Sequence, residues 1–147
     1  MDIEITEAKR EDKDFIVLAN KEIDKASFIE SSKLAENIDK DIFEDKLAVC
    51  LIAKDREKSI GMVLFSKVYW ADRGEGIYVS QAYVAPEYRK SGVFKLLINK
   101  TLNYYNDTKF LTCLVAKENF SMVNCMKAMK FEDENMISYA KNKSDFD

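Results

Sequence analysis

One strand–helix–strand stretch in the second half of the chain constrains the fold most. Residues 76–84 are rich in β-branched and aromatic side chains, which favours a strand. Pro86 ends this strand, because proline donates no backbone hydrogen bond. Residues 92–105 place apolar side chains at helical spacing, and residues 110–115 form an apolar run of strand length. A crossover of this kind joins parallel neighbours in a sheet.

The rest of the sequence adds antiparallel strands and helices around that unit. Alternating residues at the N-terminus predict a strand, two apolar runs separated by a charged turn predict a hairpin, and three further segments have helical spacing. We expect strands at residues 3–8, 47–53 and 60–69, and a last strand pair at Phe131 and 136–139. We expect helices at residues 10–23, from Ser31 or Ser32 to Ile42, and at residues 121–129. This order predicts an α/β fold with a mixed sheet and helices on both faces.

Length and composition fit a single domain that spans residues 1–147. A chain of 147 residues with 47% hydrophobic and 33% charged residues is ordinary for a soluble globular protein. The net charge of −3 argues against a nucleic-acid partner, because phosphate neutralisation requires a clustered positive surface. The longest apolar run is too short for a membrane span, and the N-terminus does not have the pattern of a signal peptide. We therefore expect a cytoplasmic protein with no nucleic-acid or membrane partner.

The residue types limit the chemistry. The sequence has no histidine, which excludes histidine bases, triads and metal ligands. The three cysteines, Cys50, Cys113 and Cys125, are odd in number and lack CxxC spacing, so neither a disulfide framework nor a zinc site is expected. Any reaction must depend on carboxylates, Tyr, Cys, Ser, Lys, backbone amides or a cofactor, and we expect no metal. The acidic residues of the first helices are expected to form a solvated face; they are Glu11, Asp12, Asp14, Glu22 and Asp24.

The loop between the two parallel strands has the features of an anion site. The helix after it begins near Gly92, and the first amides of a helix have no intrahelical partner and carry the positive end of its dipole. Gly92 would let the backbone approach an anion closely, while Arg89 and Lys90 add positive charge. A pyrophosphate would fit such a site. The plainer alternative is an ordinary strand-to-helix connection that happens to contain these residues.

This loop resembles the pyrophosphate-binding motif of the GNAT superfamily of acetyltransferases. Residues 89–94 resemble the pattern Q/R-x-x-G-x-G/A, in which Phe94 departs from the usual Gly or Ala and could narrow the phosphate site. The wider family pattern V-x-P-x-Y-R-x-x-G is matched by Val84, Pro86, Tyr88, Arg89 and Gly92.

A second segment resembles the family pattern N-x-x-A-x-x-x-Y-x-x-x-G-F. Asn119 and Phe131 match its first and last positions, and Val123 lies near the position of the Ala. Met126 stands in place of the usual Tyr, and Lys130 in place of the Gly. The resemblance covers nearly the whole chain in the order of its elements, and these two segments carry it.

The resemblance implies a GNAT fold, with a mostly antiparallel central sheet that splays between its fourth and fifth strands and binds acetyl-CoA in the wedge. By analogy, the backbone of Ala82, Tyr83 and Val84 would bind the pantetheine arm as an added strand would, and Asn119 would reach it from the other side. The alternative for Asn119 is a residue that only shapes a turn. The pyrophosphate would be held by the backbone amides of Arg89, Lys90, Ser91, Gly92, Val93 and Phe94.

The implied reaction is direct attack of a primary amine, from a small molecule or a peptide, on the thioester of acetyl-CoA. The amine must lose a proton and the oxyanion needs a hydrogen-bond donor. Where many relatives have a Glu base, this chain has Tyr78, which would position a water, with Glu75 as the base through that water. The alternatives are a half-buried sheet residue and a solvated turn charge. Met126 replaces the Tyr that usually protonates the thiolate leaving group. A covalent route through Cys125 is less favoured, because no nearby residue would stabilise its thiolate form.

Two other functions remain open. The chain could be an acyl-CoA-binding module with little or no catalysis, used for sensing or protein contact, which the missing Glu and Tyr favour. It could also be an unrelated phosphate-binding α/β domain, which the match from Asn119 to Phe131 disfavours. A homodimer is left open as well.

Overall fold

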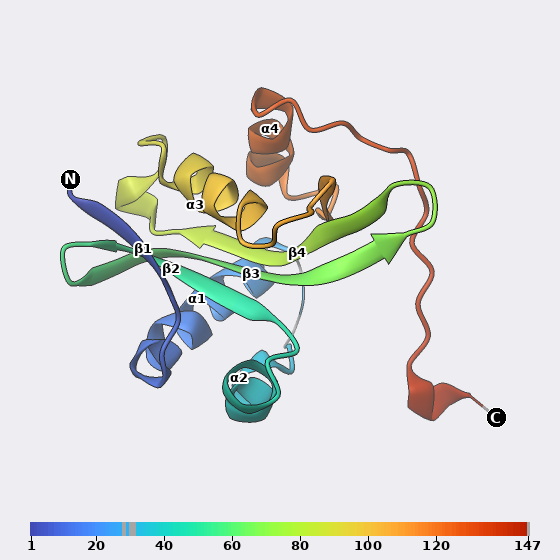
Figure 1. Cartoon of the computed structure of the whole chain (residues 1–147), viewed down its shortest axis with the longest axis horizontal. Coiled ribbons are helices and arrows are strands. Elements are labelled where there is room, and N and C mark those ends of the chain that lie inside the picture. The colour runs from blue at the N-terminus through green and yellow to red at the C-terminus, as the bar shows by residue number, and fades with distance from the viewer. Residues whose placement is uncertain (28, 30–31, 147) are drawn as a thin grey trace.

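The computed structural model describes residues 1–27, 29 and 32–146. Its strands form one sheet in the order β1-β2-β3-β4-β5 (Figure 1). They are β1 (Ile3–Glu7), β2 (Val49–Asp55), β3 (Lys58–Trp70), β4 (Gly74–Val84) and β5 (Phe110–Cys113). The first three pairings are antiparallel and the β4–β5 pairing is parallel, which confirms the predicted crossover and the mixed sheet.

Helices cover both faces of this sheet (Figure 1). On one face lie α1 (Lys13–Ala26) and α2 (Leu34–Ile38), which continues as a π-helix over Asp39–Glu44. On the other face lie α3 (Val93–Leu102) and α4 (Phe120–Ala128). Short 3-10 helices occur at Arg10–Asp12, Pro86–Tyr88 and Lys143–Asp145.

Each face of the sheet has its own apolar core. On the α1 face, Ile16 packs with Met62 and Leu64, and on the α3 face Leu97 packs with Phe65. A single strand, β3, supplies both cores because successive side chains of a strand point to opposite faces. Each such large apolar side chain stabilises the fold by about 1.5–3 kcal/mol when fully buried.

The strands β4 and β5 part near the middle of β4. Their parallel ladder begins at Gly76 and ends where Val79 pairs with Cys113, while β4 continues to Val84. A β-bulge beside Leu64 leaves Ser80 as the extra residue of β4, and the Ser80 hydroxyl donates to the Leu64 carbonyl oxygen at 3.2 Å. The sheet therefore splays between its fourth and fifth strands, as the family resemblance implies.

Some predicted boundaries are wrong by a few residues. The helix predicted to reach residue 105 ends at Leu102, and the second helix begins at Leu34 with Lys33 as its N-cap. Ser31 lies outside the described residues, and Ser32 does not cap that helix, because its hydroxyl donates to Asn20 Oδ1 at 2.7 Å.

The predicted last strand pair is wrong. Residues 114–146, all of which are described, contain no strand. Met136, Ile137 and Tyr139 are 84, 76 and 90% exposed, although their pattern is typical of a strand. A strand is stable only when its backbone groups pair with a neighbour, and the extended segment runs past the tip of the β3–β4 hairpin and away from the body of the molecule (Figure 1).

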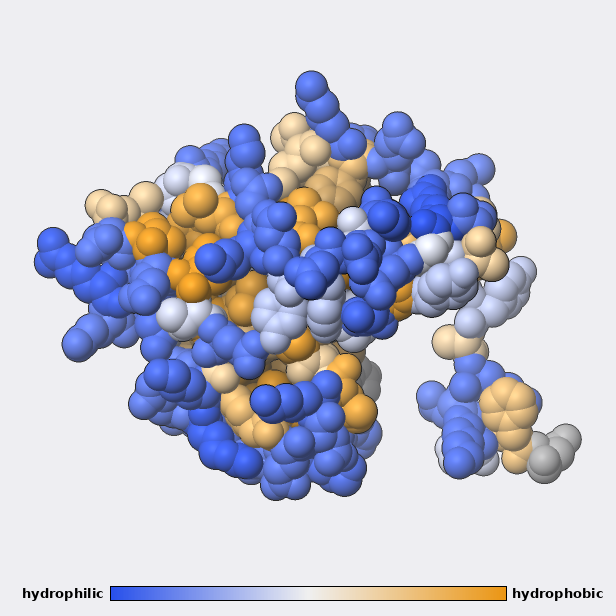
Figure 2. Space-filling view, in the orientation of Figure 1, coloured by the Kyte–Doolittle hydropathy of each residue, from blue (hydrophilic) through white to orange (hydrophobic). Residues whose placement is uncertain are grey.

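The surface is hydrophilic over most of the outer sides of the helices. Figure 2 shows apolar side chains gathered around α3 and along the sheet beneath it. In the part of the chain that the structure describes, no helix combines the length and the apolar character that a membrane span requires. The prediction of a solvated acidic face is wrong for Asp12 and Asp24, which are 5 and 6% exposed.

Candidate active site

The loop from β4 to α3 folds into a shape that presents its backbone outward. The 3-10 turn Pro86–Tyr88 follows β4, and α3 begins after Gly92. Lys90 has a φ of 61° and Gly92 a φ of 89°, so two residues of this short loop adopt the left-handed conformation. Gly92 adopts it at no steric cost, because it lacks a Cβ.

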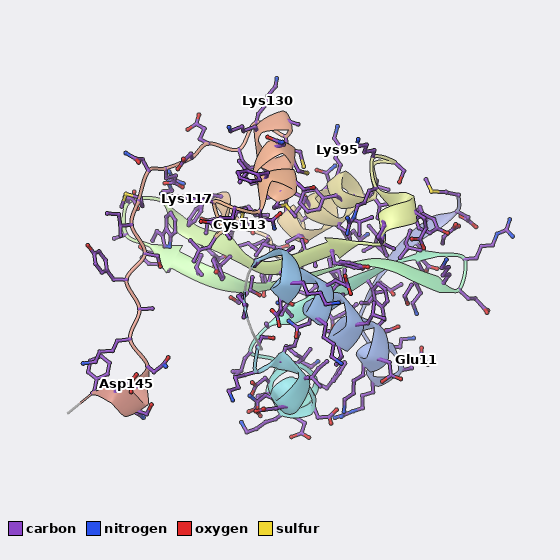
Figure 3. All side chains as sticks on the ribbon, turned by 180° about the vertical axis from the view of Figure 1, so that it is seen from behind. Glu11, Lys95, Cys113, Lys117, Lys130 and Asp145 are labelled. Atoms are coloured by element: carbon purple, nitrogen blue, oxygen red, sulfur yellow. The ribbon has the colours of Figure 1, made fainter. Side chains whose placement is uncertain are left out.

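The amides of this loop are free to bind an anion. Among the described residues, none accepts a backbone hydrogen bond from the amides of residues 90–94, whereas the Leu96 amide already donates to the Gly92 carbonyl oxygen at 3.1 Å. A Cβ placed on Gly92 would meet nothing within 4 Å, so the space before the helix is open. Unpaired amides at the positive end of a helix dipole stabilise a phosphate group there. Lys95, in the first turn of α3, adds a further positive charge on this side of the molecule (Figure 3).

Side chains of the motif hold the loop in place. The Tyr88 hydroxyl donates to Asp55 Oδ2 at 3.0 Å, which ties the 3-10 turn to the β2–β3 turn. Arg89 Nε donates to the Val84 carbonyl oxygen at 2.8 Å, and the Ser91 hydroxyl donates to the Tyr88 carbonyl oxygen. The side chains of Tyr88 and Arg89 thus position the backbone amides. Nothing in the sequence pattern indicates the role of Asp55, which looks like an ordinary charged turn residue.

The side chains of Val93 and Phe94 pack into the protein, which leaves only their backbone amides at the loop. Val93 is 1% exposed, and Phe94 packs partly buried against the core on the α3 face. Because the Phe94 side chain points into that core, it does not fill the open space before Gly92. The departure at the last motif position is therefore accommodated by packing.

The second half of β4 offers an unpaired edge toward β5. Ala82, Tyr83 and Val84 pair with β3 on one side, but the ladder to β5 has already ended at Val79. Tyr83 is 9% exposed, and its ring contacts Phe15 of α1 edge to face with centroids 6.1 Å apart. An extended ligand could add to this edge as a strand does.

Asn119 caps α4. Its Oδ1 accepts a hydrogen bond from the Met122 amide at 3.3 Å, an arrangement that stabilises a helix N-terminus. Asn119 therefore shapes the turn at the start of α4, as one of the two alternatives predicted. Its side-chain NH₂ group remains available to donate hydrogen bonds to a ligand.

The thiols near the splay are poor nucleophiles. Met126 Sδ lies 3.8 Å from Cys113 Sγ, so the residue at the position of the family's Tyr packs against β5. Burial raises the pKa of the Cys113 thiol and that of the Cys125 thiol. Both thiols stay protonated at neutral pH, because a raised pKa keeps the proton on sulfur to higher pH.

Glu75 and Tyr78 do not converge. Ile77 packs in the core on the α3 face, so the alternation of β4 places Glu75 on that face and Tyr78 on the opposite one. Glu75 Oε1 lies 3.4 Å from Lys67 Nζ. Burial raises the pKa of the Tyr78 phenol, which keeps it protonated. The predicted relay from Tyr78 through a water to Glu75 is therefore not assembled on one side of the sheet.

Comparisons with known proteins agree with this geometry. Several solved structures are similar to this chain. One is a possible acetyltransferase from Clostridium difficile 630, with a TM-score of 0.77 and 22% identity over 97% of this chain and 99% of that one. A ribosomal-protein-alanine N-acetyltransferase from Brucella melitensis biovar Abortus 2308 has a TM-score of 0.70 and 16% identity over 97% and 99%. Aminoglycoside N-acetyltransferase AAC(6')-Iy in complex with CoA has a TM-score of 0.77 and 16% identity over 96% and 95%.

These identities are low, so the three structures show a shared fold alone. A search of curated proteins found no significant match. The model of the acetyltransferase (GNAT) family matches residues 15–131, which is most of the chain. That span includes both motifs, the splayed strands and the loop before α3. The chain belongs to the GNAT acetyltransferase family.

Proposed function

We propose that the protein is an acetyl-CoA-dependent N-acetyltransferase that transfers an acetyl group to a primary amine of a small molecule or peptide. The observation that carries this proposal is the open loop before α3, where the amides of residues 90–94 are unpaired and a Cβ on Gly92 would meet nothing within 4 Å. This loop adjoins the free edge of β4. A site for a diphosphate beside an edge for an extended chain matches the two parts of CoA.

The acetyl-CoA would lie along the splay. The amides from Lys90 to Phe94 would hold its pyrophosphate, whereas the Arg89 amide, which was also predicted to do so, already donates to the Pro86 carbonyl oxygen at 3.3 Å. The backbone of Ala82, Tyr83 and Val84 would bind its pantetheine arm. The NH₂ group of Asn119 would reach that arm from the side of α4, since its oxygen already accepts from the Met122 amide. The thioester would then lie near Val79, where the parallel ladder ends.

Direct attack by the amine is the chemistry that these residues support. A protonated thiol is a weak nucleophile, and burial raises the pKa of both Cys113 and Cys125, which disfavours an acetyl-cysteine intermediate. Glu75 is paired with Lys67, so solvent is the proposed acceptor of the amine proton. Tyr78 would hold a water or the substrate amine by a hydrogen bond. The thiolate of CoA leaves without a dedicated acid, because a thiol has a pKa of about 8.5.

An acyl-CoA-binding module is the second candidate. Two features favour it. Met126 cannot donate a proton to the leaving thiolate, and Glu75 forms an ion pair with Lys67 and is therefore less able to act as a base. Such a protein would use the same loop and strand edge to bind the donor but would release no thiol with any amine.

One pair of measurements separates these functions. Thermal unfolding with and without acetyl-CoA reports donor binding, and release of free CoA thiol with a panel of primary amines reports transfer. We expect acetyl-CoA to raise the Tm and at least one amine to release thiol. Stabilisation without thiol release would support the binding module, and no stabilisation by acetyl-CoA would refute both proposals.

We also propose that two copies associate through the extended C-terminal segment. Met136, Ile137 and Tyr139 are exposed apolar side chains with a strand-like pattern, and β5 is an edge strand of the sheet in the described part of the chain. The bidentate contact of Arg73 with Glu134, at 2.9 and 3.1 Å, holds the start of the segment at the β3–β4 turn, beyond which the segment leaves the sheet (Figure 1). It would add to β5 of a second copy, beside a groove of about 390 Å³ lined by Ile98, Leu102, Leu111 and Phe131.

Light scattering of the wild type and of a variant with Met136, Ile137 and Tyr139 replaced by Ser tests this association. We expect a dimer for the wild type and a folded monomer for the variant. A monomeric wild type at micromolar concentration would contradict the proposal.

A further inference from the structure

A cavity of about 250 Å³ lies at the β1 edge of the sheet, where β1 ends and β2 begins. Glu7 and Ala8 line it from the end of β1, and Val49 and Cys50 line it from the start of β2. The anion loop follows β4 instead, and the strand β3 lies between β2 and β4 in the sheet. The cavity is therefore separate from the candidate active site.

Elements from both faces of the sheet meet around this cavity. Ile42 and Phe43 come from the π-helix that follows α2, whereas Tyr104 follows α3. Figure 1 shows α2 below the sheet and α3 above it. The Tyr104 hydroxyl donates to Glu7 Oε1, which joins the end of α3 to the end of β1 at the rim of the cavity.

The most buried part of the lining is apolar. Ile42 is 9% and Cys50 is 2% exposed, and next to them lie the partly buried side chains of Phe43, Ala48 and Val49. Burial raises the pKa of the Cys50 thiol, so this surface carries no charge at neutral pH. A lining of this kind favours the hydrocarbon part of a ligand, because binding removes apolar surface from water.

The rim of the cavity is positively charged. Arg10 and Lys46 both line it, and among the described lining residues Glu7 is the single carboxylate. Glu7 already accepts from Tyr104, and Lys46 forms no ion pair within the described part of the chain. The Arg10 guanidinium carbon lies 5.4 Å from the centre of the Phe43 ring, which holds its planar donors beside the apolar lining. Two cations against one carboxylate favour an anion.

The carboxylates next to these cations are held by other lysines. Asp39 Oδ2 lies 2.7 Å from Lys13 Nζ, whereas the contact of Asp39 Oδ1 with Arg10 Nη1 is longer, at 3.4 Å. Asp45, which precedes Lys46 in the chain, has its Oδ2 2.5 Å from Lys40 Nζ. The two cations of the rim therefore keep donors for a ligand.

The backbone beside the cavity is irregular in two places. The segment that supplies Ile42 and Phe43 is a π-helix over Asp39–Glu44, and Lys46 has a φ of 51°. π-helical turns are frequent at functional sites, and non-glycine residues in the left-handed region cluster at sites that bind ligands. Both irregularities position residues that line the cavity.

We propose that this cavity binds a small organic carboxylate with an apolar body. Arg10 and Lys46 hold the carboxylate, and Phe43 packs with its apolar neighbours against the body of the ligand. An inorganic anion would leave the apolar lining uncovered, and a neutral molecule would leave both cations without a partner. This site goes beyond the proposed acetyl transfer and does not depend on it.

Titrations followed by ¹H–¹⁵N NMR spectra test the proposal, because they report affinity and location together. The probes are hexanoate and benzoate. Each is compared with its amide, which has a similar shape and no charge, and with acetate, which has the charge and little apolar surface. We expect at least one probe to have a Kd about tenfold or more below those of its amide and of acetate. The amide resonances of residues 42–50 should shift, and those of residues 90–94 should stay in place.

Variants of the two cations identify the groups that hold the carboxylate. Arg10→Gln and Lys46→Gln should each raise the Kd of the probe about threefold, and together about tenfold, because exposed ion pairs are individually weak. The affinity for the amide should stay unchanged, which a general loss of structure would not allow. The matched control is Arg56→Gln, an exposed cation with a φ of 57° in the β2–β3 turn, which should bind the probe as the wild type does.

Three results would overturn the inference. The first is no shift at residues 42–50 with either carboxylate, including shifts confined to residues 90–94, which would place carboxylate binding at the anion loop. The second is equal affinity for the probe and for its amide, acetate or inorganic phosphate. The third is an unchanged Kd in the double variant of Arg10 and Lys46.

Discussion

Arg89 Nε donates a hydrogen bond to the Val84 carbonyl oxygen at 2.8 Å, and so joins the loop before α3 to the end of β4. The guanidinium carbon also lies 5.8 Å from the centre of the Tyr83 ring. Both contacts turn this arginine back onto the strand. Its role in the motif is therefore to fix the course of the backbone whose amides face the open space.

Replacing Arg89 should weaken donor binding through this lost contact. A hydrogen bond from a charged group contributes about 1.5–3 kcal/mol, so we expect Arg89→Gln to raise the Kd of acetyl-CoA by about tenfold or more in calorimetry. Arg89→Lys keeps the charge but lacks the planar Nε donor and should be almost as weak. Lys100→Gln, which removes an exposed charge at the far end of α3 from the loop, serves as the control. Full affinity in Arg89→Lys would show that charge and not geometry matters.

Gly92→Ala should impair both folding and donor binding. An alanine with a φ near 89° is strained, which costs about 1–2 kcal/mol, and its Cβ would occupy the space that is open before α3. Gly74→Ala is a matched control, because Gly74 has a φ of 88° but is the first residue of β4, away from the loop before α3. We expect both variants to lose similar stability on thermal unfolding, and only Gly92→Ala to lose affinity for acetyl-CoA. Equal affinity in the two variants would argue against the anion site.

The element order could be predicted because it depends on local periodicity. Strand and helix repeats are visible in residues 76–115, and the crossover rule then fixes the parallel pair. The strand at 136–139 could not be judged in this way. Its alternation is present, but a strand also needs a partner edge, and the segment leaves the sheet after Glu134 contacts Arg73 at the β3–β4 turn. Contacts between distant residues are not readable from spacing.

The backbone amides of the candidate site could be predicted, because they too depend on a local sequence pattern. The positions of its side chains could not. A glycine before a helix predicts free amides wherever the rest of the fold lies. Outside the site, Asp24 likewise looks like one acidic residue among several on an exposed helix, and only the packing of α1 on the sheet shows that it is buried. Glu75 and Tyr78 are close in sequence, yet their odd separation along a strand puts them on opposite faces.

Tyr78 should act as a hydrogen-bond donor and not as a base. Burial raises the pKa of its phenol above the usual value of 10.0, so the proton stays on oxygen throughout the range from pH 6 to 9. The kcat/KM profile should therefore rise with pH only as the acceptor amine loses its proton. We expect Tyr78→Phe to lower kcat about 2- to 12-fold, the loss of one neutral hydrogen bond of about 0.5–1.5 kcal/mol, without moving that rise.

The control for this experiment is Tyr69→Phe on β3, since Tyr69 is 76% exposed. Its pH profile and its kcat should match those of the wild type. A rise that moves to higher or lower pH in Tyr78→Phe alone would show that the phenol itself titrates during turnover.

The start of the β4–β5 ladder depends on the absence of a side chain at Gly76. A Cβ there would lie 2.5 Å from Cε1 of Phe110, whose ring packs at a tilt against Trp70 with centroids 4.8 Å apart. Overpacking of this kind costs about 1–3 kcal/mol, so Gly76→Ala should lower the Tm by about 3–10 °C. Phe110→Leu should partly rescue it, because a shorter side chain leaves room for the methyl group. In a double-mutant cycle of thermal unfolding, the two changes should therefore cost less together than their sum, whereas strict additivity would mean that the ring is not what excludes a side chain at Gly76.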